Sequence, residues 1–85
     1  MTTENKDDQK VYKYKDTEIW FLNGKIHRDE NKPSLSTKNF KGYFKNGVEH
    51  RLDGPAIEFT NGYKEWWING RKYKEEDFYK IKSKL

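Results

Sequence analysis

An Asn-Gly pair recurs every 23 residues along this chain, and this internal repeat constrains the fold more than any other feature. Asn-Gly between alternating apolar residues favours a two-residue β-hairpin, because a type I′ turn needs positive φ at both central positions. The three pairs are Asn23-Gly24, Asn46-Gly47 and Asn69-Gly70. We therefore expect three copies of one hairpin unit, laid side by side in a mainly antiparallel β-sheet of roughly six or seven strands.

A two-residue turn also fixes which residues face each other across the hairpin. The predicted cross-strand pairs are Trp20 with His27, Tyr43 with His50, and Trp66 with Tyr73. The first ring of each pair should stack with its equivalents in a column on one face of the sheet. The aromatic residue that follows each of these rings should form a second column on the other face.

The pattern of apolar and turn residues predicts the remaining elements. We expect strands at residues 11–15, 19–22, 25–28, 38–42, 56–60 and 63–68, with turns at 16–17 and 61–62. Residues 1–9 are polar after the first methionine and predict a disordered tail, which leaves 10–85 as one domain. A helix is expected at 75–84, where Phe78, Ile81 and Leu85 fall at helical spacing and acidic residues precede basic ones. It would cap the last hairpin, as terminal units of repeat arrays often do.

Composition limits the core of this single domain. Only 32% of the 85 residues are hydrophobic and 38% are charged, but 16% are aromatic, and each buried ring removes a large area from water. We assign Trp20, Trp66, Phe44 and Phe59 to this thin core. Because a thin core and open sheet edges both favour pairing, we expect a homodimer, formed through residues 11–15 or through an aromatic face.

Several kinds of site are not indicated. The chain has no cysteine, so disulfides and thiolate metal sites are excluded, and no local cluster of other metal ligands occurs. There is no Gly-rich phosphate loop and no serine nucleophile motif, so we expect no cofactor and no enzyme. No run of residues has the length and apolarity of a membrane span or signal-peptide core, which predicts a cytoplasmic protein without membrane contact.

The segment at residues 43–56, YFKNGVEHRLDGPA, resembles a short MORN-like β-repeat common in proteins of phages and large DNA viruses. The first copy keeps Asn23-Gly24, His27, Arg28 and Pro33, whereas the third replaces His-Arg with Tyr73-Lys74. The resemblance covers residues 11–74. It implies a twisted antiparallel sheet that binds other molecules and supplies no catalytic residues. It also suggests a phage protein, and small basic phage proteins of one class neutralise bacterial RNase toxins of toxin–antitoxin systems.

The two histidines, His27 and His50, allow two interpretations. An RNA-cleaving enzyme uses a pair of histidines as acid and base. Because both occupy the same repeat position, we favour packing: each imidazole would stack on Trp20 or Tyr43 and hydrogen-bond a neighbouring turn.

The segments at residues 27–33 and 50–55, which we call connectors, lead from the first two hairpins to the next strand, and each contains an arginine with more than one possible role. Arg28 and Arg51 would pair with Asp29 and Asp53 or with a glutamate on a facing strand, or else hold phosphates.

Charge and aromatic residues together indicate nucleic acid. The net charge is +4, and because the first nine residues hold one Lys and three acids, residues 10–85 carry +6. Single-stranded RNA binds to a basic groove with rings on which bases stack. The candidate phosphate contacts are Lys38, Lys41, Lys45, Arg71, Lys72 and Lys74. The candidate stacking rings are Phe40, Tyr63 and Tyr79; Tyr12 and Tyr14 are also expected on the surface.

We therefore predict a small, non-enzymatic binding protein that associates with RNA, with a host RNA-handling protein, or with both, and so inhibits host defence. One alternative is a protein–protein interaction module whose basic surface is incidental or docks an acidic partner. A more remote alternative is a ribonuclease that uses the two histidines.

Overall fold

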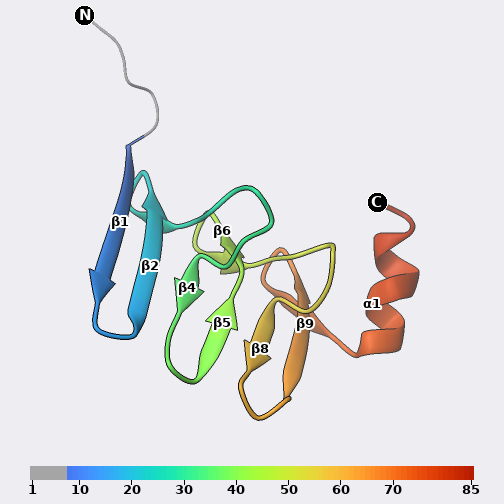
Figure 1. The fold of residues 1–85 in the computed structure, drawn as a ribbon. Coiled ribbons are helices and arrows are strands. Elements are labelled where there is room, and N and C mark those ends of the chain that lie inside the picture. The colour runs from blue at the N-terminus through green and yellow to red at the C-terminus, as the bar shows by residue number, and fades with distance from the viewer. Residues whose placement is uncertain (1–7) are drawn as a thin grey trace, which may run out of the picture.

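The computed structural model describes residues 8–85, and these form an antiparallel β structure with one short C-terminal helix (Figure 1). The predicted fold class is therefore confirmed. The elements of this part of the chain are β1 (Gln9–Tyr14), β2 (Thr17–Leu22), β3 (Lys25–Ile26), β4 (Leu35–Ser36), β5 (Phe40–Gly42), β6 (Phe44–Lys45), β7 (Val48–Glu49), β8 (Ile57–Phe59), β9 (Lys64–Ile68), β10 (Arg71–Tyr73) and α1 (Glu75–Lys82).

The strands within residues 8–85 are more numerous than the six or seven expected. Eight of them form one sheet, in the order β1-β2-β4-β5-β8-β9-β10 with β3 also on β2, and β6 and β7 form a separate two-stranded ladder. Four of the observed strands were not among those predicted. Leu35–Ser36 pairs as β4, the arms that return from the second and third Asn-Gly turns pair as β7 and β10, and the strand before the second turn continues after an interruption at Tyr43 as β6.

All three Asn-Gly pairs adopt the predicted turn. The asparagines have φ of 50° to 52° and the glycines of 80° to 88°, as a type I′ turn requires. The predicted register is also confirmed, since Phe21 pairs with Ile26, Leu22 with Lys25, and Trp66 with Tyr73.

The unit of the repeat is a three-strand zigzag. A first strand turns at one end of the sheet into a long second strand, which passes through the Asn-Gly turn into a short third strand. The next unit adds its first strand beside the second strand of the previous unit, as β4 does on β2 and β8 does on β5. Figure 1 shows the three hairpins β1–β2, β4–β5 and β8–β9 in a row, with α1 beyond the last.

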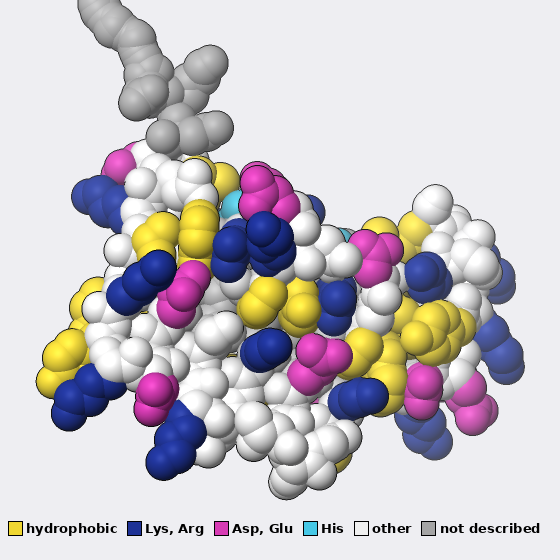
Figure 2. Space-filling model, in the orientation of Figure 1, with side chains coloured by type: hydrophobic (Ala, Val, Ile, Leu, Met, Phe, Trp, Pro, Cys, Tyr) yellow, Lys and Arg dark blue, Asp and Glu magenta, His cyan; other side chains and the backbone are white. Residues whose placement is uncertain are grey.

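The core is thinner than the sequence suggested, and it lies towards the C-terminal end. The buried hydrophobic residues are Ala56, Ile57, Ile68 and Phe78. All four expected core rings, Trp20, Trp66, Phe44 and Phe59, are only half-buried. The molecule measures 48 × 34 × 17 Å, and Figure 1 shows the hairpins in one row with α1 beyond the last, so within residues 8–85 no helix covers the first two units. Figure 2 accordingly shows hydrophobic side chains between charged ones on the surface.

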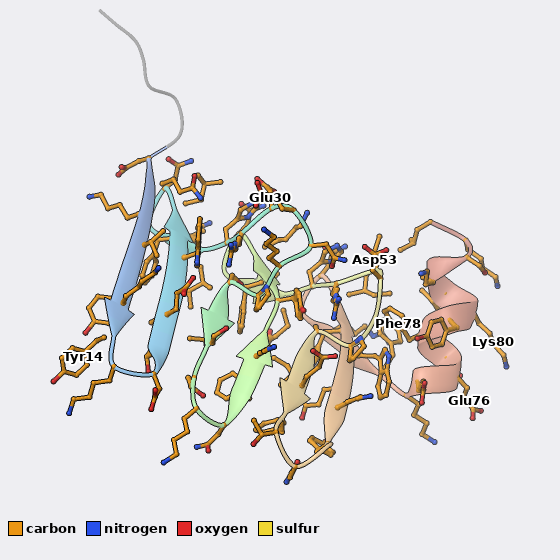
Figure 3. The ribbon with its side chains drawn as sticks, viewed as in Figure 1. Tyr14, Glu30, Asp53, Glu76, Phe78 and Lys80 are labelled. Atoms are coloured by element: carbon orange, nitrogen blue, oxygen red, sulfur yellow. The ribbon has the colours of Figure 1, made fainter. Side chains whose placement is uncertain are left out.

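Helix α1 covers the last unit through Phe78, which is completely buried and lies between α1 and β9 (Figure 3). The helix ends at Lys82 and not at residue 84, and Ser83 caps it, with its Oγ donating to the carbonyl of Lys80 at 2.7 Å. Because the helix stops there, the predicted apolar stripe does not reach Leu85, which is 72% exposed, while Ile81 is half-buried.

The N-terminal boundary also differs from the prediction. The tail predicted for residues 1–9 overlaps β1, which begins at Gln9, and residues 1–7 lie outside the described part of the chain. Asp8 exchanges hydrogen bonds with the first Asn-Gly turn: its carbonyl accepts from the backbone N–H of Asn23, and its own N–H donates to Asn23 Oδ1, both at 2.9 Å.

Candidate nucleic-acid interface

The histidines join successive units. The backbone N–H of Asn46 donates to Nδ1 of His27 at 3.0 Å, and the N–H of Asn69 donates to Nδ1 of His50 at the same distance. In both cases the histidine of one unit binds the Asn-Gly turn of the next, as predicted. Because Nδ1 must be unprotonated to accept this bond, both rings are held in the tautomer with hydrogen on Nε2. Burial, followed by the charge of Lys45, lowers the pKa of His50, which favours this neutral form.

The stacking partner of the aromatic residues is arginine, and this corrects the prediction that histidine stacks there. The guanidinium of Arg28 lies 3.7 Å from the ring centre of Trp20, and that of Arg51 lies 3.8 Å from the ring centre of Tyr43. The rings of the predicted columns make no ring–ring pair with one another within residues 8–85. A planar guanidinium suits this position because it stacks and donates hydrogen bonds at the same time.

The same arginines hold their connectors. Arg28 Nη1 donates to the carbonyl of Pro33 and Arg51 Nη1 to the carbonyl of Pro55, each at 3.1 Å. Their carboxylate partners lie on strands, at 3.7 Å for Glu18 and 3.9 Å for Glu58. Of the two predicted kinds of acidic partner, the strand glutamates are therefore the ones observed.

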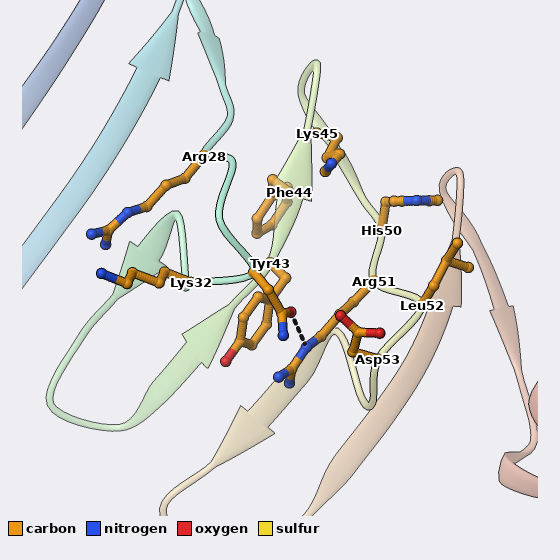
Figure 4. A pocket seen from close by; sticks show the side chains of 10 residues that line it. Arg28, Lys32, Tyr43, Phe44, Lys45, His50, Arg51, Leu52 and Asp53 are labelled. Atoms are coloured by element: carbon orange, nitrogen blue, oxygen red, sulfur yellow. Dashed lines mark hydrogen bonds between the residues drawn. The ribbon is translucent and has the colours of Figure 1, made fainter.

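A central pocket of about 250 Å³ lies between the first two connectors (Figure 4). Its cationic lining residues are Arg28, Lys32, Lys45 and Arg51, and the ring of Tyr43 forms one wall. Most of these cations already have partners: both arginines pair with glutamates, and Lys45 lies 3.9 Å from Asp29. The dashed bond in Figure 4 joins Arg51 Nε to Asn31 Oδ1 at 3.0 Å. Most cations of this pocket thus bind other residues of the protein, and their main role is to hold the two connectors in place.

A second, more basic cavity is the groove between β10 and α1, with a volume of about 510 Å³. We call it the β10–α1 groove. It is lined by Arg71, Lys72, Tyr73, Lys74, Asp77, Lys80, Ile81 and Lys84. Five cations thus face one carboxylate. Within residues 8–85, only Lys72 of these five takes part in an ion pair, with Glu65 at 3.4 Å.

The pairing of Lys72 is visible in both partners' pKa values. Hydrogen bonds to Tyr63 and then to Glu65 raise the pKa of Lys72. Burial acts to raise the pKa of Glu65, but the indole N–H of Trp67, which donates at 2.9 Å, and the nearby Lys72 outweigh it and lower this pKa. Lys72 therefore stays charged, with its charge partly neutralised by Glu65.

The fold separates the six predicted phosphate contacts into three places. Arg71, Lys72 and Lys74 come together in the β10–α1 groove, whereas Lys45 lines the central pocket. Lys38 and Lys41 lie on the middle hairpin, in the turn after β4 and within β5. Lys80 and Lys84 belong to the groove but were not among the predicted contacts. The sequence feature that could have identified them is their four-residue spacing on the predicted helix, which places both on the same helix face.

The three candidate stacking rings also have different surroundings. Tyr63 and Tyr79 are 50% and 47% exposed. Phe40 is half-buried and packs on Phe59 with ring centres 5.4 Å apart. Because Tyr63 and Tyr79 also each contact another ring, at 5.6 Å and 5.0 Å, exposure is what distinguishes the two tyrosines from Phe40. Of the other expected surface rings, Tyr12 and Tyr14 are exposed on β1, and Figure 3 shows Tyr14 pointing away from the sheet.

Fold and site together define a β-repeat protein with a helical cap and a basic groove at the capped end. Comparison of the chain with models of known protein families, with curated proteins and with solved structures gave no match. The MORN-like resemblance therefore stays a prediction. Among residues 8–85, His, Asp and Glu side chains form no group of three or more that could hold a metal ion. The one helix of this region is too short and polar to cross a membrane.

Proposed function

We propose that this protein is a non-enzymatic binder of single-stranded RNA, and that the β10–α1 groove holds the phosphates. One observation carries the proposal: four cations of the groove, Arg71, Lys74, Lys80 and Lys84, make no ion pair within residues 8–85. In the central pocket, by contrast, three of four cations are paired. Unpaired cations around a groove attract a polyanion at long range and release its counterions on contact.

The salt dependence of RNA affinity tests this proposal. A single-stranded oligonucleotide bound through several phosphates loses affinity steeply as salt rises, with a slope of about −0.7 per phosphate contacted. Replacing Arg71, Lys80 and Lys84 together by Gln should weaken binding and make the slope shallower by about 2. Fluorescence anisotropy of a labelled oligonucleotide, measured over a series of salt concentrations, gives both values.

The chain offers a charge-matched control. Replacing Lys10, Lys13 and Lys15 by Gln removes the same charge from β1 and its turn, at the opposite end of the sheet from α1 (Figure 1). This control should keep the slope of the wild type. Equal effects of the two triple variants would mean that only net charge matters, and an absence of RNA binding at low salt would refute the proposal outright. The same comparison with Lys38 and Lys41 changed to Gln tests the predicted contacts outside the groove.

The proposal includes no catalysis, because both histidines have structural bonds. In His27, Nδ1 accepts from Asn46 and Nε2 lies 3.0 Å from Asp29 Oδ1. A ribonuclease would need two such rings around one phosphate. Changing His27 and His50 together to Asn, which keeps an acceptor near Nδ1, should have no effect on any RNA cleavage seen in the purified protein.

We further propose that the protein acts in the cytoplasm of a host cell, where it binds an RNA-handling protein such as an RNase toxin and inhibits it by occlusion. Its small size, basic charge and repeat resemblance support this role. Capture of partners from a bacterial lysate with and without nuclease separates the modes of contact. A partner kept after nuclease treatment supports direct protein contact, and a partner lost supports an RNA bridge.

Protein–protein association is the second candidate function, and the exposed edge of β1 favours it. All six residues of this strand are exposed, and among the strands of residues 8–85 β1 pairs with β2 alone. Such an edge can add a strand from another chain. Sedimentation over a range of protein concentrations tests for a homodimer. Replacing Val11 by Pro on this edge should abolish the dimer if pairing runs through β1.

A further inference from the structure

The third unit differs from the first two at the ring on which an arginine stacks. Trp20 and Tyr43 each carry a guanidinium at 3.7 Å and 3.8 Å from the ring centre. Trp66 is the equivalent ring of the third unit, but the position of the arginine, 23 residues after Arg51, holds Lys74. Within residues 8–85, neither a cation nor another ring stacks on Trp66.

The third unit also lacks the strand that follows the other two. In the first two units, a strand of the next unit closes the edge beside the ring: the N–H of Trp20 donates to the carbonyl of Ser34 at 2.8 Å, and that of Tyr43 to Ala56 at 2.7 Å. After the third unit the described chain continues as α1, which begins at Glu75. The edge beside Trp66 therefore stays open, and a pocket of about 360 Å³ remains there.

This pocket has a mixed lining of three lysines and two glutamates, and it connects to the basic β10–α1 groove. The pocket is lined by Lys64, Glu65, Trp66, Lys72, Tyr73, Lys74 and Glu75. Three of these residues, Lys72, Tyr73 and Lys74, also line the groove. A chain of alternating phosphates and planar groups could thus run along β10, with phosphates in the groove and a planar group in the pocket.

We infer that the pocket beside Trp66 holds one nucleobase of a single-stranded RNA, stacked on the indole ring in the place that a guanidinium occupies in the other units. This inference rests on the function proposed above and adds the site of base recognition. A base has the flat shape and thickness of a guanidinium, and stacking on an aromatic ring accepts any base. The pocket itself has three lysines against two glutamates, so the adjoining β10–α1 groove, with five cations against one carboxylate, is what favours a base attached to phosphates over a cationic guest such as a partner's arginine.

Two single variants test the stack without removing the phosphate contacts. Lys74→Arg keeps the charge and restores the guanidinium of the first two units, which should cover Trp66 and exclude a base. Lys80→Arg is its matched control, because Lys80 lines the groove but not the pocket. Trp66→Leu removes the ring itself, and circular dichroism checks that this variant remains folded.

Each variant is titrated with two probes of equal charge, a short oligouridine and its abasic counterpart. The wild type should bind oligouridine about 5- to 150-fold more tightly than the abasic strand, which is the range expected for stacking one base. Lys74→Arg and Trp66→Leu should reduce this ratio towards one, because each prevents stacking of the base and neither removes a positive charge from the groove. Lys80→Arg should retain the ratio.

The outcomes distinguish this inference from the proposed function. If both probes bind equally to the wild type, or if the ratio survives in Lys74→Arg and Trp66→Leu, the base site is refuted while phosphate binding in the groove stands. If neither probe binds, both proposals fail. If an acidic peptide instead binds the wild type and loses its affinity in Lys74→Arg, the pocket belongs to a protein partner and the base site is again refuted.

Discussion

The first two units and the third unit use the same aromatic position in different ways. In the first two, an arginine stacks on the ring, the next unit hydrogen-bonds to the backbone beside the ring, and a histidine accepts a hydrogen bond from the next Asn-Gly turn. In the third, Lys74 replaces the arginine, Tyr73 replaces the histidine and a helix replaces the strand. The units that have a successor use their side chains to bind it. The third unit is followed by a helix instead, and within residues 8–85 no cation stacks on its ring and Lys74 takes part in no ion pair.

The two ends of the sheet also differ in how they are stabilised. Every residue of β1 is exposed, so the N-terminal edge depends on its backbone ladder with β2. The C-terminal end has the apolar burial, in Ile57, Ile68 and Phe78 among others. Because apolar burial is the main stabilising contribution in folding, the C-terminal end should determine the stability of the domain.

The largest expected effect concerns this difference in burial. Phe78→Ala leaves a cavity where a completely buried ring packs, so it should lower the free energy of unfolding by about 3–5 kcal/mol. Urea denaturation followed by circular dichroism measures this change. The neighbouring Tyr79→Ala is the control, since that ring is 47% exposed and its loss should cost much less. Similar losses in the two variants would contradict a core centred on α1.

The next effect tests the different roles of the equivalent residues Arg51 and Lys74. Arg51→Ala removes the stack on Tyr43 and the bond to Pro55, and should lower the free energy of unfolding by about 1–3 kcal/mol. Lys74→Ala should change it by less than about 0.5 kcal/mol, because Lys74 is exposed. Thermal denaturation of both variants measures these changes in stability. An equal loss of stability in the two variants would contradict the proposed difference between the units.

A smaller, pH-dependent effect concerns the bond between His50 and Asn69. The folded protein lowers the pKa of His50 below its ordinary value of 6.5, so the unfolded chain binds a proton more readily. The stability from this bond is therefore complete above pH 6.5 and is lost as the pH falls through the folded pKa. His50→Asn offers an acceptor that does not titrate, and it should be less sensitive to acid than the wild type in denaturation from pH 7.5 to 5. His50→Ala should lose about 0.5–1.5 kcal/mol at pH 7.5. An identical pH dependence in His50→Asn and wild type would show that another group is responsible.

The smallest effect distinguishes an Asn-Gly turn that packs on a neighbouring unit from one that does not. Gly24→Ala and Gly70→Ala each force alanine to positive φ, at a cost of about 1–2 kcal/mol. A Cβ on Gly70 would also lie 3.4 Å from Cβ of Val48, whereas one on Gly24 would have nothing within 4 Å. Gly70→Ala should therefore be the more destabilising by a few tenths of a kcal/mol in paired denaturation curves. The reverse order would indicate that the turn does not press on the preceding unit.

Much of the architecture was predictable because it depends on local chemistry. The Asn-Gly turns, the pairing of Trp66 with Tyr73 and the start of α1 at Glu75 all follow from backbone preferences and from the period of the repeat. The bond of each histidine to the next turn was predictable from their shared repeat position. The sequence could not show that arginine rather than histidine lies on the rings, because both residues are adjacent in the chain and both can stack.

The site was predicted only in part. Arg71, Lys72 and Lys74 are near neighbours in sequence and do share a groove, but Lys38 and Lys41 lie on another hairpin. Lys80 and Lys84 join the groove because α1 folds back beside β10. Ion pairing then separates available cations from occupied ones, and it depends on carboxylates brought in by other strands.

By itself, the sequence determined the three turns, the strand register and the presence of the helix, since these depend on φ preferences and spacing within a few residues. Only the tertiary structure decided which rings are covered, which lysines are paired and where an open pocket remains. Those properties depend on what each neighbouring unit supplies. The third unit keeps the ring of its predecessors but has no following repeat within the described chain, and its unfilled stacking position follows from that.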